Sequence, residues 1–415
     1  MPGKNVVRYI SRLVDGTGVD GVKNVNTKRV AIWMTFTILL AFLFGWSTVK
    51  ANRDDIDVRR LFDDLYWQPL LETIHLLENE HYNFSTSDRE AMVEEAIRGI
   101  LQEIDDPYAR YLDPEDYRIE QEDRIDGEFS GLGVVITMQE DRLTVISPYM
   151  GSPAFQAGVR AGDVILSIDG ISTEGMAMDE AVRRLRGPVG TQVVLEIERE
   201  GLDGVYATTV IRDIIRIKSV EFELIEEGIG LLRLNQFHGK TDSELREALE
   251  ALKRLEVRGL ILDLRNNPGG LLTTAIQSTG LFVPRDGPLL IIQDNTGRRD
   301  VLRNFNPRVW DAPIVILINE GTASGAEIMA GALRVNLYTE IIGEKSFGKG
   351  VVQQIFPLSH GGGILFTVSE FFLPDGTKIK ERGIEPDVVV EDDEEQMETA
   401  LREIQRMLNE VAMVR

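Results

Sequence analysis

The stretch "IVILINEGTASGAEIMAGALR", Ile314–Arg334, decides how the last part of this chain folds. Its first residues are β-branched or leucine and carry no charge, which is typical of a buried strand. The residues after the "GTASG" turn favour a helix, and this helix is expected to open at Ser324. A strand that leads directly into a helix is the repeating unit of an α/β sheet.

The same alternation extends through residues 213–390. Strands are predicted at "GIGLLRLNQF", "VRGLILDLRNN", "YTEIIGE", "GVVQQIFPL" and "GILFTVSEFF", and helices at "DSELREALEALKRL" and "LLTTAIQSTGLF". Residues 213–390 are therefore expected to form an α/β core, a mixed sheet with crossover helices. Residues 391–415 are rich in glutamate with heptad-like apolar positions, which predicts a terminal helix.

Two further segments precede this core. Residues 126–212 contain short β-branched runs separated by turns, with one amphipathic helix at "MDEAVRRLRG", and predict a compact β-rich domain. Residues 50–125 place apolar side chains at three- and four-residue steps, which predicts a helical N-terminal domain.

The N-terminal region predicts a membrane anchor. Val30–Val49 is uncharged and apolar, and its length matches one crossing of a hydrocarbon core. A cleaved signal peptide is the alternative, although the leader is long and no A-x-A site follows the apolar run. Residues 1–29 are rich in Lys and Arg, so they are expected to form a cytoplasmic tail. The remainder would then face outward, in a bacterium toward the periplasm or the cell exterior.

Composition excludes several classes of function. The 68 acidic and 45 basic residues give a formal charge of −23, which repels phosphate backbones and argues against a nucleic-acid partner. The chain has no cysteine, so thiolate catalysis, disulfides and cysteine-ligated zinc are excluded. The acidic run "EDDEE" lacks a ligand pattern, and neither a metal nor another cofactor is expected.

Ser324 is a candidate nucleophile because a helix N-terminus offers unpaired N–H groups and a partial positive charge to an oxyanion. An ordinary N-cap serine is the alternative. A serine nucleophile needs a base, and the contexts of the four histidines, His75, His81, His238 and His360, are those of surface or turn residues. Lysine is the remaining option if burial lowers its pKa toward neutrality, and "GEKSFGKG" supplies Lys345 and Lys349.

The segment Gly343–Lys349 also matches the G-x-x-x-x-G-K frame of a phosphate-binding loop. Gly350 stands where that loop needs Ser or Thr to bind magnesium. The β-branched residues that follow predict a strand, whereas a phosphate-binding loop leads into a helix. Nucleotide binding is therefore not expected.

Several motifs in one order resemble the C-terminal processing, or tail-specific, serine proteases. They are "LDLRNNPGG", "GTASGAE", the lysine segment and "LPDGTKIKERGIEPD". The resemblance implies Ser324 as nucleophile, Lys349 as general base and Gln353 as the side chain that orients the lysine amine. It also implies an oxyanion hole from Gly325 and from Gly269 or Gly270, without deciding between the last two. Lys345 matches no motif and is expected to be a surface cation.

Residues 126–212 resemble a PDZ domain through "GEFSGLGVVI", "GSPAFQAGVRAGDVILSIDG" and "RGPVGT". A loop at Ser130, Gly131, Leu132 and Gly133 can turn N–H groups toward a peptide carboxylate, and the strand from Val134 offers an edge to an extended peptide. An ordinary hairpin bend is the alternative.

The expected function is a membrane-anchored serine endopeptidase that recognises exposed C-terminal tails of proteins through its PDZ domain. The alternative is a catalytically inert PDZ-bearing scaffold or tail-binding adaptor. Expected partners are protein or peptide substrates with exposed C-termini, the membrane through one helix, and further copies of the chain in a homo-oligomer. An adaptor or lipoprotein partner is left open, as are the natural substrates.

Overall fold

The computed structural model describes residues 67–126, 128–201, 204–216 and 218–414. The predicted cytoplasmic tail, residues 1–29, and the predicted membrane span, Val30–Val49, lie outside these ranges. Among the described residues, no helix is both long and apolar enough to cross a membrane. The chain divides into two units, Met1–Asp88 and Arg89–Arg415.

The described part of the first unit is helical. Helix α4 (Gln68–Glu80) has Pro69 in its first turn, where the missing N–H of proline costs no intrahelical hydrogen bond. It ends at His81, whose N–H donates to Leu77 O at 3.2 Å, and all of its side chains are at least partly exposed. Helix α5 (Thr86–Gln102) begins at the end of this unit.

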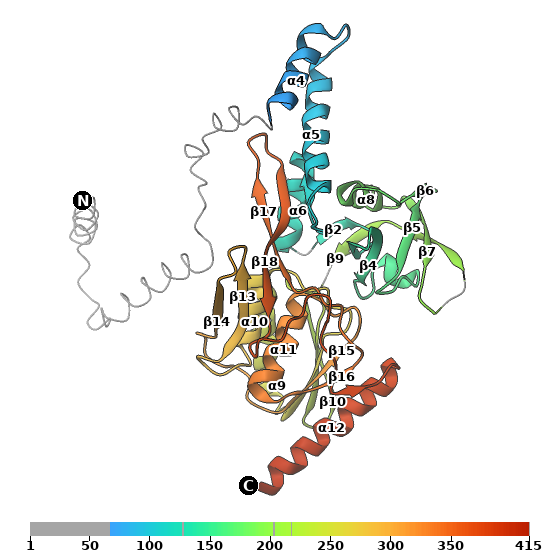
Figure 1. The fold of residues 1–415 in the computed structure, drawn as a ribbon. Helices are drawn as coiled ribbons and strands as arrows, with labels where there is room; N and C mark the ends of the chain where they lie inside the picture. Colours follow the sequence, from blue (N-terminus) through green and yellow to red (C-terminus); the bar gives the residue numbers. More distant parts are fainter. Residues whose placement is uncertain (1–66, 127, 202–203, 217, 415) are drawn as a thin grey trace, which may run out of the picture. The chain divides into compact units, whose positions relative to one another are not determined.

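The second unit is built around a six-stranded mixed sheet (Figure 1). Only β10 runs antiparallel to its neighbour, while the other neighbouring pairs are parallel. The central strands β12 and β15 are buried at every position, because helices cover both faces of the sheet. The order is β10 (Val220–Glu226), β11 (Ile229–Leu234), β12 (Gly259–Asp263), β15 (Ile314–Ile318), β16 (Glu340–Gly343) and β19 (Val388–Val389).

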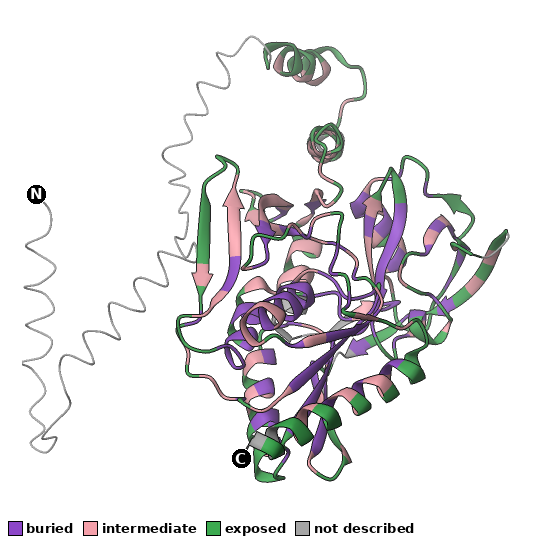
Figure 2. Cartoon of the chain, turned by 60° about the horizontal axis from the view of Figure 1, so that its bottom comes forward, coloured by how far each residue is buried: buried purple, intermediate pink, exposed green. Residues whose placement is uncertain are grey.

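Four helices accompany this sheet: α9 (Thr241–Arg254), α10 (Leu272–Gly280), α11 (Gly325–Leu337) and α12 (Asp393–Val414). The first three contact one another in sequence order, and α12 packs on the opposite face through Ala400 and Ile404. Figure 2 shows α12 with exposed residues along its outer side. The carboxyl ends of the parallel strands share one edge of the sheet, so the loops after β12, β15 and β16 meet there.

A second, antiparallel sheet was not expected from the sequence. It contains β1 (Arg110–Leu112), β18 (Gly363–Phe372), β13 (Pro288–Asp294) and β14 (Arg299–Arg303), with β17 (Val351–Pro357) also paired to β18. Strand β1 lies inside the segment predicted to be helical. Tyr111 and Leu112 are buried there, and β1 pairs with β18, a partner far away in the chain that no local pattern reveals.

The β-rich domain has the predicted strands and its single longer helix, α8 (Met178–Leu185). Leu195, Ile165 and Val145 are in its core, and β7 alternates strictly between exposed and buried positions. A separate pair, β2 (Glu128–Gly131) with β9 (Asp213–Arg216), joins the two ends of the domain. Its main sheet comprises β3 (Val134–Gln139), β4 (Arg142–Pro148), β5 (Val164–Ile168), β7 (Gln192–Glu198) and β8 (Val205–Ile211), with β6 (Ile171–Ser172) paired to β5. The domain also contains the short helix α7 (Pro153–Gln156), and helix α6 (Pro114–Asp126) precedes it in the chain.

Candidate active site

Ser324 lies at the turn between β15 and α11, in the N-cap position of the helix. Its backbone has φ 51° and ψ −114°, whereas an N-cap residue normally has extended φ and ψ. A residue other than glycine in this region costs about 1 to 3 kcal/mol and persists where the surrounding structure enforces it, most often at functional sites. Ser324 and Glu327 form a capping box, so the serine does cap α11, and only its backbone conformation departs from that of an ordinary cap. This strained conformation is the feature that favours a nucleophile.

Hydrogen bonds tie the Ser324 turn to the loop after β12. Thr322 Oγ1 donates to Leu264 O at 2.9 Å, and Ala323 N–H donates to Asn267 O at 2.9 Å. Phe347 N–H donates to Thr322 O at 3.0 Å, which adds the lysine-bearing loop. The three loops at the carboxyl edge of the sheet are thus joined directly.

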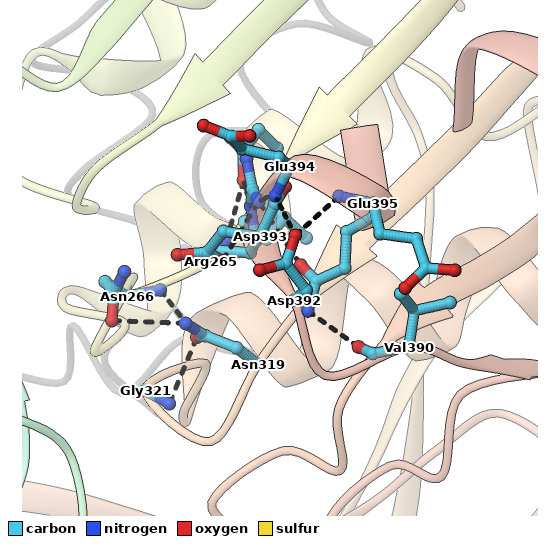
Figure 3. Close-up of polar contacts among 12 residues, drawn as sticks. Arg265, Asn266, Asn319, Gly321, Val390, Asp392, Asp393, Glu394 and Glu395 are labelled. Atoms are coloured by element: carbon cyan, nitrogen blue, oxygen red, sulfur yellow. Dashed lines mark hydrogen bonds and ion pairs between the residues drawn. The ribbon is translucent and has the colours of Figure 1, made fainter. Parts of the chain in front are cut away.

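Asn319 fixes the start of the same turn, and Figure 3 shows it between Asn266 and Gly321. Its Oδ1 accepts the N–H groups of Asn266 at 2.8 Å and Gly321 at 3.1 Å. Asn266 O also accepts the hydroxyl of Ser147 from β4 at 3.0 Å, so the β-rich domain contacts this loop. A side chain on Gly321 would meet both Asn266 and Ser147, which explains why glycine is required there.

Arg265 anchors the other side of this loop. Its guanidinium donates to both carboxylate oxygens of Asp263, at 2.9 and 2.8 Å, and to Asp393 Oδ1 at 3.1 Å, as Figure 3 shows for Asp393. These acidic partners raise the pKa of Arg265 against the opposing effect of burial. The contact holds the first turn of α12 against the end of β12.

The "NPGG" loop packs directly on the Ser324 turn. A Cβ on Gly269 would lie 2.7 Å from Gly325 N and 2.7 Å from Ser324 Cβ, so only glycine fits. Gly269 N–H donates to Asn267 Oδ1 at 2.9 Å. Phe237 N–H donates to Gly269 O, and Phe237 O accepts Leu271 N–H. Phe237 thus bonds to the residues on both sides of Gly270, as in a parallel bridge, and the N–H of Gly270 itself points away from Phe237.

Glu327, which the sequence analysis did not single out, joins the two candidate catalytic segments. Its side chain is fully buried in the first turn of α11. Oε2 accepts the N–H groups of Ser324 at 2.7 Å and Lys349 at 3.0 Å. Oε1 accepts Ser346 Oγ at 2.6 Å and Gly348 N–H at 2.8 Å. Burial raises the pKa of Glu327 to about 7, although these four hydrogen bonds oppose the shift.

Lys349 lies in the loop between β16 and β17 and is half-buried. Its Nζ lies over the Tyr108 ring, 4.6 Å from the ring centroid. Gln353 follows on β17, opposite Thr367 of β18. A Cβ on Gly350 would lie 2.2 Å from Lys380 N, so the residue after Lys349 must be glycine. Tyr108 is a second site residue that the sequence analysis missed, because its contact crosses most of the chain.

The other lysine and the histidines have different surroundings. Lys345 is exposed and pairs with Glu385 at 2.8 Å, as expected of a surface cation. His360 Nε2 lies 2.7 Å from the Tyr111 hydroxyl, in the loop between β17 and β18. His238 is buried in the turn before α9, where its Nδ1 accepts Lys240 N–H at 3.3 Å.

The four predicted carboxylate-binding residues lie at the end of β2 and in the turn to β3. Ser130 Oγ donates to Gly187 O at 2.8 Å, and the Leu132 side chain is in the domain core. Gly133 has φ 74°, and a Cβ there would lie 2.3 Å from Ser152 Cβ. The side chains of Ser130 and Leu132 serve the fold, so this turn could offer a carboxylate only its backbone N–H groups.

A cleft of about 1190 Å³ is lined by the end of α5, the turn after it and β1, and by residues of the β-rich domain and of the α/β core. Thr137 and Met138 of β3 contribute to one wall, and Phe347 and Gly348 of the lysine loop contribute to another. Tyr108 lines the same cleft. The edge of β3 and the segment before Lys349 thus face one continuous space.

Comparisons with known proteins agree with this arrangement. Residues 228–390 match Peptidase family S41, and residues 144–199 match the PDZ domain. A carboxy-terminal-processing protease of Bartonella bacilliformis is 42% identical over 314 residues, which cover 73% of this chain and 70% of the relative. The carboxy-terminal processing protease CtpA of Bacillus subtilis is 34% identical over 353 residues, which cover 85% of this chain and 74% of that protein.

Among solved structures, a photosystem II D1 C-terminal processing protease is similar in fold and sequence. It aligns with a TM-score of 0.66 and 31% identity, over 78% of this chain and 86% of that protein. The resemblance inferred from the sequence motifs is confirmed, as is the prediction of an enzyme. The chain belongs to the C-terminal processing serine proteases and is a serine peptidase with a PDZ domain.

Proposed function

We propose that this peptidase cleaves proteins upstream of exposed C-terminal tails with a Ser324–Lys349 dyad. The observation that carries the proposal is the pair of hydrogen bonds by which Ser324 and Lys349 share Glu327 Oε2, at 2.7 and 3.0 Å. A buried carboxylate thereby fixes the backbone of both residues to the same point. The strained backbone of Ser324 is consistent with a positioned nucleophile.

In the proposed reaction, Ser324 Oγ attacks the carbonyl carbon of the scissile bond and passes its proton to neutral Lys349 Nζ. The resulting oxyanion accepts hydrogen bonds from backbone N–H groups at the helix N-terminus. When the C–N bond breaks, the protonated lysine returns the proton to the leaving amine. Water then attacks the acyl carbon while Lys349 Nζ accepts one of its protons. The ester C–O bond breaks, the protonated lysine returns that proton to Ser324 Oγ, and the carboxylic acid product leaves.

For the oxyanion hole we select Gly325 and Gly270. Gly325 N opens α11 directly after the nucleophile, where helical N–H groups have no intrahelical partner. Gly269 N–H already donates to Asn267, whereas the Gly270 amide points away from Phe237. Gln353 is assigned to orient the Lys349 amine, because a neutral amide can accept a hydrogen bond from lysine without adding a counter-charge that would raise its pKa.

For tail recognition we assign the carboxylate to backbone N–H groups of the Gly131–Gly133 turn, and the extended tail to the edge of β3. The tail would then follow the cleft from Thr137 and Met138 toward Phe347 and Gly348, directly before Lys349 in the chain. Selectivity would come from access of a free C-terminus as much as from the residues at the cleaved bond.

We also propose that Val30–Val49 anchors the protein in a membrane, with the N-terminal tail in the cytoplasm and the catalytic part in the periplasm or outside the cell. A homo-oligomer is proposed as well. The uncharged run with its basic flank supports the anchor and its orientation. The homo-oligomer stays a prediction. Extraction of bacterial membranes with carbonate and protease accessibility in spheroplasts test the anchor. Release of the full-length chain by carbonate, or protection of the PDZ domain from added protease, would contradict it.

The activity is tested with the full-length chain in detergent, incubated with a protein that has an unfolded C-terminal tail. Intact-mass analysis should show cleavage by the wild-type enzyme and none by Ser324→Ala. A fluorophosphonate should label the wild-type enzyme on Ser324. Cleavage by the pure Ser324→Ala variant would overturn the assignment, and so would a label that maps to another residue.

A further inference from the structure

Tyr108 makes a contact with Lys349 that the proposed reaction does not require. The lysine Nζ lies 4.6 Å from the centroid of the Tyr108 ring. An ammonium group over the face of an aromatic ring is attracted by the negative charge of that face, whereas a neutral amine gains much less. The contact therefore favours the protonated lysine, and a general base must be unprotonated to act.

The position of Tyr108 is fixed by Asp106. The Asp106 carboxylate accepts Tyr108 N–H at 3.1 Å, Thr367 N–H at 2.7 Å and Thr367 Oγ1 at 3.0 Å. Ala109 N–H closes the turn on Asp106 O at 3.0 Å, with Pro107 between them. The turn is thereby attached to β18 immediately before β1 pairs with the same strand.

The lysine is attached to the same strand from its other side. Gln353, proposed to orient the Lys349 amine, lies opposite Thr367 in the β17–β18 pair. Thr367 thus contacts Asp106 and faces Gln353, so the aromatic ring and the proposed base are held by adjacent elements of one sheet.

The Tyr108 hydroxyl remains protonated across the working range. Burial raises the pKa of Tyr108 to about 12, with a hydrogen bond from Thr137 acting in the opposite direction. The side chain therefore acts on Lys349 as a neutral ring and neither pairs with it as a phenolate nor accepts its proton.

We propose that Tyr108 is a positioning residue for Lys349, whose ring holds the amine in its charged form in this conformation and so limits the supply of neutral base. The inference rests on the proposed function, because it requires Lys349 to be the base. Replacing the ring with an aliphatic side chain of similar size removes the cation–π contact and keeps the apolar cover. The neutral amine then forms at lower pH.

The charged groups around the pair are the same in the wild type and in the variants. Glu327, Asp106 and Glu381 act on Tyr108 directly. The cleft beside it is also lined by Arg98, Glu103, Asp105, Arg110, Glu140, Asp141, Asp179 and Lys380. A difference between Tyr108 variants therefore reports the ring rather than a change in the surrounding charges.

The test measures kcat/KM against pH for a short peptide substrate, using the full-length wild type, Tyr108→Leu and Tyr108→Phe. The rise of kcat/KM with pH on the acidic side of the profile is called the acidic limb. In Tyr108→Leu this limb should move to lower pH by about 0.5 to 1 pH unit, which is the shift expected from losing a cation–π contact at a half-buried site. At a pH below that limb, kcat/KM should be about three- to tenfold higher than in the wild type. Tyr108→Phe keeps the ring, and its limb should stay at the wild-type pH.

The inference is overturned if the limb of Tyr108→Leu stays in place or moves to higher pH. It is also overturned if Tyr108→Phe shifts as far as Tyr108→Leu, because the hydroxyl would then be responsible. Tyr108→Met removes the ring in a second way and replaces Tyr108→Leu if the latter lacks the wild-type circular dichroism spectrum. An active Lys349→Arg enzyme would instead refute the proposed function, so the two failures are distinguishable.

Discussion

The N–H groups of Ser324 and Lys349 donate to the same oxygen of Glu327, at 2.7 and 3.0 Å. Ser346 and Gly348 donate to its other oxygen. Four donors converge on one buried carboxylate, so it is saturated as an acceptor. Glu327 therefore sets the relative position of the proposed nucleophile and base without contacting substrate.

Replacing Glu327 with Gln should lower kcat by about 10- to 100-fold, with a smaller change in KM. One carboxylate oxygen becomes an NH₂ group that faces two N–H or O–H donors, and each buried donor left unpaired costs about 1 to 3 kcal/mol. Steady-state kinetics of the pure variant measure this change. Glu320→Gln is the control in the same turn, because it makes the same change at an exposed carboxylate that lies beside Gly162. Equal loss in both variants would contradict a positioning role for Glu327.

Glu327 should also make stability depend on pH. Its pKa in the folded protein is about 7, above the ordinary value of 4.5, so the folded state binds the proton more tightly. This contribution is fully present below pH 4.5 and is lost as pH rises through 7. The unfolding free energy of the wild type minus that of Glu327→Gln should fall by roughly 2 to 3 kcal/mol between pH 4.5 and 8. Urea denaturation at several pH values measures it, and a difference that rises with pH would contradict the assignment.

The strained backbone of Ser324 predicts an unusual order of stability among inactive variants. At φ 51° and ψ −114°, glycine avoids the steric cost that a Cβ incurs. Ser324→Gly should therefore be more stable than Ser324→Ala by about 1 kcal/mol, although glycine loses more entropy on folding. Denaturant unfolding of both proteins checks this order. A more stable alanine variant would show that the turn relaxes to ordinary helix-cap geometry.

Much of the α/β core could be predicted from the sequence, because β12 and β15 are short uninterrupted apolar runs that alternate along the chain with segments favouring helix. The strand, turn and helix around Ser324 could also be predicted, because they are formed by residues that are consecutive in the chain. Strand β1, Tyr108 and the role of Glu327 could not be predicted, since their partners lie in distant segments. Two signals for Glu327 were available: the S-x-x-E spacing from Ser324, which is the pattern of a capping box, and an acidic residue on the first turn of an otherwise almost wholly apolar helix.

Tail recognition predicts a dependence on the free carboxylate of the substrate. A carboxylate bound by several N–H groups gains from its charge, and amidation removes that charge. Amidating a tail should raise KM about tenfold or more while changing kcat less, if the Gly131–Gly133 turn binds it. Matched free-acid and amidated peptides measure the effect. Equal KM values would refute tail recognition at this turn and leave the dyad in place.

The most direct test of the central claim, that Lys349 is the general base for Ser324, compares Lys349→Arg with Lys345→Arg. Both variants keep a cation, but guanidinium cannot be deprotonated in a protein and so cannot accept the serine proton. Lys345 pairs with Glu385 on the surface and serves as the matched control. Initial rates against pH should show Lys349→Arg reduced by at least about 10³-fold at every pH and Lys345→Arg close to the wild type. An active Lys349→Arg enzyme, or loss of activity in Lys345→Arg alone, would contradict the account.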